Sequence, residues 1–348
     1  MNTLASALAL PVASALAPSF RHLRRMTTGI GVFEHALNDV PRVEHGYCVD
    51  DVARALTVVV REPDQTPELA QLTDTYLSFL EAAVAPDGLV HNRMDADGQW
   101  ADEATVGDWW GRAVGALGFA AAHSVLPFHR TRAMYAFLRA AARRSPDVRA
   151  SAFAALGAVE VLSVRSDADA ARALLVACLD VIPTAPLGAW DWPEARLRYA
   201  NATLCEALIA GGGVLGRRDL VARGLALLSF LLRTEEGPGG RLSLTGSAGR
   251  GPGESGPLWD QQAIEAAALA DACARAFHET LDPLWRGGVQ IAWAWFLGEN
   301  DSATPMYDPV TGAGFDGLEP AGRNANRGAE STLAALDTLQ HARALGVA

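Results

Sequence analysis

The stretch VRASAFAALGAVEVLSVRSDADAARALLVACLDVI, residues 148–182, decides the fold prediction. Alanine, valine and leucine recur with helical periodicity over residues 148–164 and again over residues 168–182. Only residues 165–167 separate the two runs, and their Ser and Asp are typical of a tight turn. The stretch therefore predicts two antiparallel helices joined as a helical hairpin.

The same pattern extends outward in both directions along the chain. Runs rich in alanine and leucine alternate with breaks at Gly, Pro, Asp and Ser, and almost no segment alternates with the period of two that marks a strand. The runs predict about twelve helices, at residues 19–38, 50–61, 66–84, 108–125, 130–144, 148–164, 168–182, 200–214, 217–233, 259–279, 281–298 and 328–345.

The connections between these helices alternate in length and composition. Those that lead into the odd-numbered helices are short, whereas most of those that lead into the even-numbered helices are long and rich in Gly, Trp and carboxylates, at residues 41–49, 85–107, 183–199, 237–258 and 298–327. Six hairpins with one plain rim and one decorated rim predict an all-α (α/α)6 toroid, in which each hairpin buries its apolar face against its neighbours. An open helical solenoid is the alternative. We expect one barrel domain over residues 19–348 after an N-terminal extension at residues 1–18.

The composition limits the chemistry. The chain has 348 residues, 29 basic and 40 acidic, a net charge of −11, and every basic residue is arginine. Without lysine, no P-loop lysine, Schiff base or lysine general base can form. The acidic excess and the lack of a basic run argue against nucleic-acid or anionic-membrane partners. Neutral or cationic partners remain.

Cofactors, metals and membrane spans find no support in the sequence. The four cysteines show no CxxC spacing, the eight histidines show no HExxH spacing, and no GxGxxG follows a strand. We therefore expect no cofactor and no metal site. Residues 4–17 are apolar, yet no basic residue precedes them, and no stretch reaches the length of a membrane span. We expect a cytoplasmic protein.

Tryptophan and carboxylates lie together in the long connections, as in Asp108-Trp109-Trp110, Trp190-Asp191-Trp192 and Trp259-Asp260. An indole face fits the C–H face of a pyranose, and a carboxylate accepts hydrogen bonds from hydroxyls. This combination predicts a carbohydrate cleft at the decorated rim. The alternatives are that the tryptophans plug the core and that the acids at helix starts are caps.

Apart from His35, which lies in the first predicted helix, the candidate site residues lie at or near predicted helix starts on this rim or in its loops. The candidate catalytic acids are Asp51, Asp108, Asp260 and Glu330. The candidate substrate-binding residues are His35, Tyr47, Asp50, Arg54, His91, Trp109, Trp110, Arg112, Trp192, Asn201, Trp259, Gln261 and Asn326.

Several stretches resemble a bacterial family of (α/α)6-barrel proteins that is labelled glycosyltransferase or glycosidase-like. They are HGYCVDDVARAL at residues 45–56, GDWWGRAVGALG at 107–118, WDQQAIEA at 259–266, YDPVTGAGFDGL at 307–318 and NANRGAESTLAAL at 324–336. The chain departs from this family at Thr28-Gly29, where relatives usually have a second Asp-Asp, and at Val52, where they often have Asn. The resemblance implies a toroid that acts on glycans and is sometimes encoded beside glycosyltransferases and mannoside phosphorylases.

The sequence thus leads to three hypotheses. The first is an inverting glycoside hydrolase that acts on a neutral glycan, such as a mannoside or glucoside, with an acid and a base drawn from across the barrel mouth rather than from the adjacent Asp50 and Asp51. The second is a sugar epimerase or isomerase that uses histidine as acid and base. The third is a non-catalytic glycan-binding partner of a glycosyltransferase.

Overall fold

The computed structural model describes residues 17–188 and 190–348, and helices dominate them. The helices are α1 (Arg21–Met26), α2 (Val49–Arg61), α3 (Pro67–Ala83), α4 (Asp108–His123), α5 (Pro127–Ala140), α6 (Val148–Val164), α7 (Asp169–Val181), α8 (Asn201–Leu215), α9 (Arg218–Thr234), α10 (Ala263–Thr280), α11 (Pro283–Leu297) and α12 (Ala329–Ala344).

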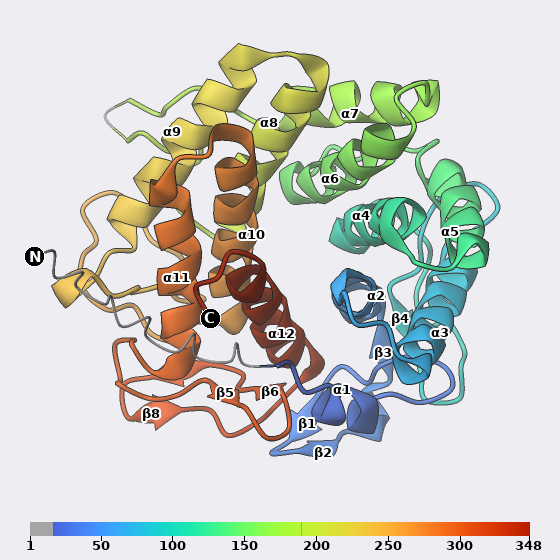
Figure 1. Ribbon diagram of the computed structural model, residues 1–348, viewed down its shortest axis with the longest axis horizontal. Helices are drawn as coiled ribbons and strands as arrows, with labels where there is room; N and C mark the ends of the chain where they lie inside the picture. The colour runs from blue at the N-terminus through green and yellow to red at the C-terminus, as the bar shows by residue number, and fades with distance from the viewer. Residues whose placement is uncertain (1–16, 189) are drawn as a thin grey trace, which may run out of the picture.

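The even-numbered helices form a closed inner ring (Figure 1). Each of α2, α4, α6, α8, α10 and α12 packs against the next, and α12 returns to pack against α2. The odd-numbered helices from α3 to α11 lie outside this ring, each beside its hairpin partner. The predicted (α/α)6 barrel is confirmed, and the contact between α12 and α2 excludes an open solenoid.

Burial explains which helices are inner and which are outer. Helix α6 buries most of its residues around its whole circumference, from Arg149 to Leu162. Helix α9 buries only Gly224, Leu227, Leu228 and Leu231, which form one stripe. A helix that is apolar all round needs neighbours on every side, whereas an amphipathic helix covers a core with one face. The sequence therefore assigns α6 to the inner ring and α9 to the outer one.

Two inner helices come unusually close together. A Cβ atom placed on Gly157 of α6 would lie 2.3 Å from the carbonyl oxygen of Val114 in α4, and one placed on Gly118 of α4 would lie 2.3 Å from the carbonyl oxygen of Gly157. Real Cβ atoms do not approach backbone so closely. Glycine at these positions therefore sets the distance between α4 and α6.

Short strands tie the long connections together at the rim where the even helices begin. Strands β3 (Tyr47–Cys48) and β4 (Arg93–Met94) pair antiparallel, so the connections into α2 and α4 are joined. The other pairs are β1 (Ala36–Leu37) with β2 (Val40–Pro41), β5 (Tyr307–Asp308) with β6 (Ala313–Gly314), and β7 (Leu318–Glu319) with β8 (Gly322–Arg323). Strands are minor elements, as the sequence predicts.

Three predicted helices have the wrong bounds. The fifth is predicted over residues 130–144, but α5 spans Pro127–Ala140, because Pro127 occupies its first turn, where a proline is tolerated. The first helix was expected over residues 19–38, but α1 ends at Met26, because the Thr28 hydroxyl accepts a hydrogen bond from the Ile30 N–H and turns the chain. The tenth helix was expected from residue 259, but α10 begins at Ala263, because Asp260 has a φ of +56° that no helix allows.

The structure covers only part of what the sequence predicts about the N-terminal extension and membrane spans. Residues 1–16 of the expected N-terminal extension lie outside the described residues. Across the described ranges, none of the helices combines the length and the apolar character that crossing a bilayer requires.

Candidate active site at the barrel mouth

A cleft of about 520 Å³ opens where the even helices begin. Its walls come from the first turns of α2, α4 and α12 and from the loops before them, including Asp50, Asp108 and Glu330. Because the N-termini of the inner helices all point to this end, their dipoles favour negative charge there. The helix order explains why carboxylates from distant parts of the chain meet in one cleft.

Asp50 and Asp51 begin α2 and have different surroundings. Asp51 is buried; its Oδ2 accepts a hydrogen bond from the Cys48 thiol at 3.1 Å and its Oδ1 accepts one from Arg54 Nη1 at 2.7 Å. Burial raises the pKa of Asp51 to about 7, against the opposing effect of Arg54. Asp50 instead forms an ion pair with Arg112, with 3.1 Å between Oδ1 and Nε.

Arg54 joins two carboxylates of the cleft. While Nη1 binds Asp51, Nη2 lies 2.7 Å from Oε2 of Glu330, in the first turn of α12. The Arg54 side chain is largely buried, whereas 41% of the Glu330 side chain is exposed. One guanidinium therefore holds an accessible carboxylate and a buried one in fixed relative positions.

Asp108 is the first residue of α4 and is half-buried at the cleft wall. Burial raises the pKa of its carboxyl, although Arg112 lies close enough to oppose the shift. In the part of the chain that the structure describes, Arg112 pairs with Asp50 and Asp108 forms no ion pair. Asp108 is therefore a partly accessible cleft carboxyl that holds its proton more readily than an exposed Asp does.

Three polar atoms of cleft residues are buried without a hydrogen-bond partner among the described residues. They are the Arg54 Nε donor and the acceptors Asp50 Oδ1 and Asn92 Oδ1. Leaving buried polar atoms unpaired costs free energy, so such atoms commonly bind water or a ligand. A hydroxyl group both donates and accepts hydrogen bonds and would suit each of these atoms.

Only some of the predicted tryptophans reach the cleft. Trp109 lines it and donates a hydrogen bond from Nε1 to the Val90 carbonyl oxygen at 2.9 Å. Trp110 and Trp192 are fully buried and cannot present a face to a sugar, so packing is the role we assign to them. Trp259 and Asp260 lie in the loop before α10, and neither residue lines the cleft.

Three further predicted residues have structural partners in the core. Tyr47 is buried and stacks on Phe33, with 4.7 Å between ring centroids. Buried Gln261 donates to Asp301 Oδ2 at 2.8 Å. Asn201, at the start of α8, binds both the N–H and the carbonyl oxygen of Arg198. Core packing or loop closure therefore accounts for all three side chains.

The remaining predicted residues lie in or near the rim loops. His35 is exposed and lines the cleft, 5.0 Å from the ring of His45. His91 stacks on Trp100 and binds the Asp102 carbonyl oxygen at 2.8 Å, and Asn326 accepts a hydrogen bond from the Asn38 N–H at 2.9 Å. Of these three, only His35 lines the cleft.

The structure adds cleft residues that the sequence analysis did not select. Glu34 forms an ion pair with Arg93, and both line the cleft. Asp316 lines it as well and accepts a hydrogen bond from the Gly328 N–H at 2.7 Å. Glu34 precedes His35, and Asp316 lies within the YDPVTGAGFDGL stretch, so both were adjacent to signals that were already recognised.

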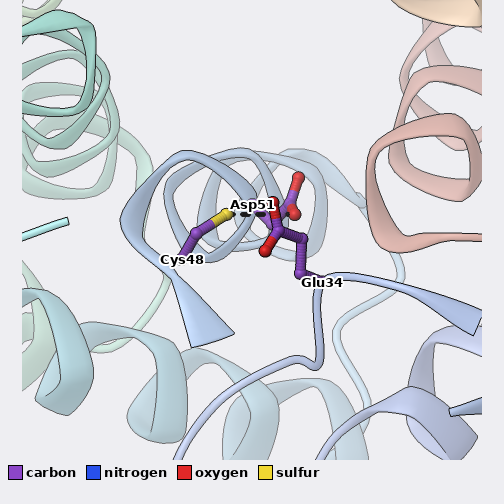
Figure 2. Close-up of side chains that lie close together, drawn as sticks. All are labelled: Glu34, Cys48 and Asp51. Atoms are coloured by element: carbon purple, nitrogen blue, oxygen red, sulfur yellow. Dashed lines mark hydrogen bonds between the residues drawn. The ribbon is translucent and has the colours of Figure 1, made fainter. Parts of the chain in front are cut away.

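One group at the cleft has the donor atoms of a metal site. Glu34, Cys48 and Asp51 each offer an atom, and these atoms lie within 4.8 Å of one another (Figure 2). However, both oxygens of Asp51 already accept hydrogen bonds, from the Cys48 thiol and from Arg54. Arg93 binds Glu34, and burial raises the pKa of the Cys48 thiol, which keeps its proton. The group fits a hydrogen-bonded cluster that orients Asp51 better than it fits a cation.

No protein-family model and no curated protein sequence matches this chain. Solved structures with a similar fold include a cellobiose 2-epimerase from Bacillus thermoamylovorans B4167, 10% identical with a TM-score of 0.71 over 94% of this chain and 96% of that one. A sugar epimerase from a ruminal bacterium is 13% identical, with a TM-score of 0.69 over 93% and 95%. The GH76 α-mannanase of Bacteroides thetaiotaomicron is 10% identical, with a TM-score of 0.64 over 93% of both chains. These likenesses agree on the barrel fold.

Proposed function

We propose that this protein is a carbohydrate-active enzyme, specifically an inverting glycoside hydrolase that acts on a neutral glycan such as a mannoside or glucoside. The observation that carries the proposal is the placement of Asp108 and Glu330 at the starts of α4 and α12, on the two inner helices that flank α2. The barrel is also the fold of the epimerases and the mannanase above, whose substrates are sugars.

Asp108 acts as the general acid. Its pKa is raised by burial, so a larger share of the carboxyl is protonated near neutral pH than for an exposed Asp. It donates this proton to the glycosidic oxygen as the bond to the leaving sugar breaks. The Arg112 guanidinium, which is bound to Asp50, lies close by and stabilises the carboxylate that remains.

Glu330 acts as the general base. Its carboxylate is the more exposed of the two that bind Arg54, so water can reach it. It accepts a proton from a water molecule that attacks the anomeric carbon from the face opposite to the leaving group, which inverts the configuration. Asp51, also predicted as a catalytic acid, is buried behind Arg54 and positions that guanidinium.

The charges in the cleft favour a neutral glycan. Every arginine that lines it is bound to a carboxylate: Arg54 to Asp51 and Glu330, Arg93 to Glu34, and Arg112 to Asp50. The lining carboxylates outnumber these arginines. No guanidinium is left to pair with a uronate or phosphate, which would meet repulsion instead.

A second candidate is a sugar epimerase or isomerase. In that case His35, which is exposed in the cleft, would act as acid or base. A non-catalytic glycan-binding partner of a glycosyltransferase is the third. A functional link to a glycosyltransferase or a mannoside phosphorylase stays a prediction.

The test is a product assay on a panel of manno- and gluco-oligosaccharides and of free reducing sugars. We expect shorter glycans to be released, and Asp108→Asn and Glu330→Gln each to lower kcat by about 10²–10⁴-fold. Glu44→Gln is the matched control, because Glu44 is an exposed rim carboxylate paired with Arg42 outside the cleft. Conversion of a reducing sugar without cleavage supports the epimerase, and saturable binding without any product supports the non-catalytic partner.

A further inference from the structure

A second cavity lies on the barrel axis beneath the cleft. It has a volume of about 170 Å³, and Arg54 and Arg112 line both spaces. Its other charged residues come from the middle and far ends of the inner helices, including Arg61, the last residue of α2. We call this space the lower chamber. It faces the end of the barrel opposite to the proposed active site.

Negative charge is in excess in this lower part of the barrel. Four carboxylates and two guanidiniums line the chamber there: Glu160, Glu206, Asp271 and Asp337, with Arg61 and Arg275. Arg275 binds Glu160 at 2.5 Å and lies 3.8 Å from Glu206, while Arg61 binds Asp337 and lies 3.4 Å from Asp271. The imidazoles of His123 and His341 also contact Glu160 and Asp271. With both imidazoles neutral and the other groups ionised, the carboxylates carry two more charges than the guanidiniums balance, which is costly at buried positions.

Two of these carboxylates, Asp271 and Asp337, meet a histidine, His341, beside the chamber. Asp337 and His341 are four residues apart on α12 and therefore share a face, and Asp271 reaches them from α10. His341 Nε2 lies 2.6 Å from Asp271 Oδ1. One donor atom from each of the three residues lies within 4.8 Å of the others. An imidazole and two carboxylates are a donor set that zinc binds in proteins.

One atom of this group has no partner. Asp337 is 8% exposed, and its Oδ2 is fully buried without a hydrogen bond in the residues that the structure describes. Its other carboxylate oxygen is bound by Arg61. A buried carboxylate oxygen without a donor is destabilising, so this atom indicates a missing partner, a place that a cation can fill.

We propose that Asp271, Asp337 and His341 bind a divalent cation of the zinc type at the lower chamber. The cation would be bound by His341 Nε2, by Asp337 Oδ2 and by an Asp271 oxygen, with water from the chamber as a fourth ligand. His341 would bind as a neutral imidazole, with Nε2 on the cation and its hydrogen on Nδ1. The two positive charges of the cation offset the two excess negative charges.

The location gives the cation a structural role. Asp271 and His341 belong to the neighbouring inner helices α10 and α12, and Arg61 ends α2, which packs against α12 on its other side. A bound ion would therefore fasten α10 to α12 where the ring closes. This inference is independent of the reaction at the barrel mouth.

The test uses the full chain, stripped of metal with a chelator and titrated with Zn²⁺, and separately with Mn²⁺ and Mg²⁺. We expect saturable 1:1 binding of Zn²⁺, with Mg²⁺ much weaker. Asp337→Asn and His341→Asn should each weaken Zn²⁺ binding by at least about tenfold. Co²⁺ in place of Zn²⁺ gives visible absorption in a tetrahedral site, which reports on the wild-type chain without any substitution.

Two variants serve as controls. His123→Asn removes an imidazole that binds a single carboxylate, Glu160, at 2.7 Å at the same end of the barrel. Cys48→Ser removes a donor from the group at the cleft. Both should bind Zn²⁺ as the wild type does. Zn²⁺ should also raise the Tm of the wild type and both controls but not of Asp337→Asn.

Three results would overturn the proposal. They are the absence of saturable binding to the wild-type chain, loss of binding in Cys48→Ser, and an equal Zn²⁺-dependent rise of Tm in wild type and Asp337→Asn. Circular dichroism of each metal-free variant establishes that it is folded before it is titrated.

Discussion

The contact between α4 and α6 makes Gly157→Ala the sharpest test of the barrel packing. A Cβ atom at position 157 would lie 2.3 Å from the Val114 carbonyl oxygen and 2.8 Å from the Gly115 Cα. Both atoms are backbone of an inner helix and cannot rotate away. The two helices must therefore move apart by roughly 1 Å to reach an ordinary contact, and the packing around them loosens.

The expected loss of stability is the balance of two effects. Forcing one extra methyl group into a packed core costs about 1–3 kcal/mol and sometimes more. Alanine in place of glycine within a helix returns about 1 kcal/mol. We therefore expect Gly157→Ala to lower the free energy of unfolding by up to about 2 kcal/mol, which for a chain of 348 residues lowers Tm by up to about 3 °C.

Gly287→Ala is the matched control. Gly287 also lies within a helix, α11, but a Cβ atom there would meet nothing within 4 Å. Only the helix-propensity effect remains, so Tm should rise by about 1 °C. Thermal unfolding of both variants, followed by circular dichroism, gives the comparison. If Gly157→Ala unfolds at or above the temperature of Gly287→Ala, α4 and α6 do not pack as described.

Three further predictions concern the cleft. Burial raises the pKa of Asp51 from 3.8 to about 7, so the folded protein keeps a proton that the unfolded chain loses, and this carboxyl's contribution to stability falls as pH rises through that window. As pH rises from 3.8 to about 7, the Tm of wild type should therefore fall relative to the Tm of Asp51→Asn. A Tm difference that stays constant over this range would contradict the account. Arg54→Gln leaves buried Asp51 without its cation, so urea unfolding should show a loss of about 3 kcal/mol, whereas an unchanged midpoint would refute the bridging role. Trp109→Ala removes an aromatic wall of the cleft and should raise KM about tenfold with little change in kcat; an unaltered KM would place the sugar elsewhere.

The hairpin at residues 148–182 shows why the fold was predictable. Helix α6 spans Val148–Val164, the same bounds that the sequence predicts, because a long alanine-rich run carries a strong periodic signal. The first helix prediction failed because the run includes Thr27 and Thr28, whose hydroxyls bind nearby backbone and compete with the helix. Periodicity reports where side chains are apolar and does not report such local competition.

The candidate site was predictable in part for similar reasons. Asp108 and Glu330 could be found because they begin helices whose N-termini the barrel brings together. Trp109 and Trp110 are adjacent, yet one lines the cleft and the other is buried, which depends on the rotation of α4 against its neighbours. Asp271 and His341 are 70 residues apart, so no local pattern could have indicated that they meet.

The anomeric configuration of the first product tests the central claim most directly. A glycan that the enzyme cleaves is followed by proton NMR from the start of the reaction, before the free sugar mutarotates. The account predicts that the anomer opposite to that of the cleaved linkage appears first and that Asp108→Asn greatly slows its appearance. A first product that retains the configuration, or one epimerised without cleavage, would contradict it.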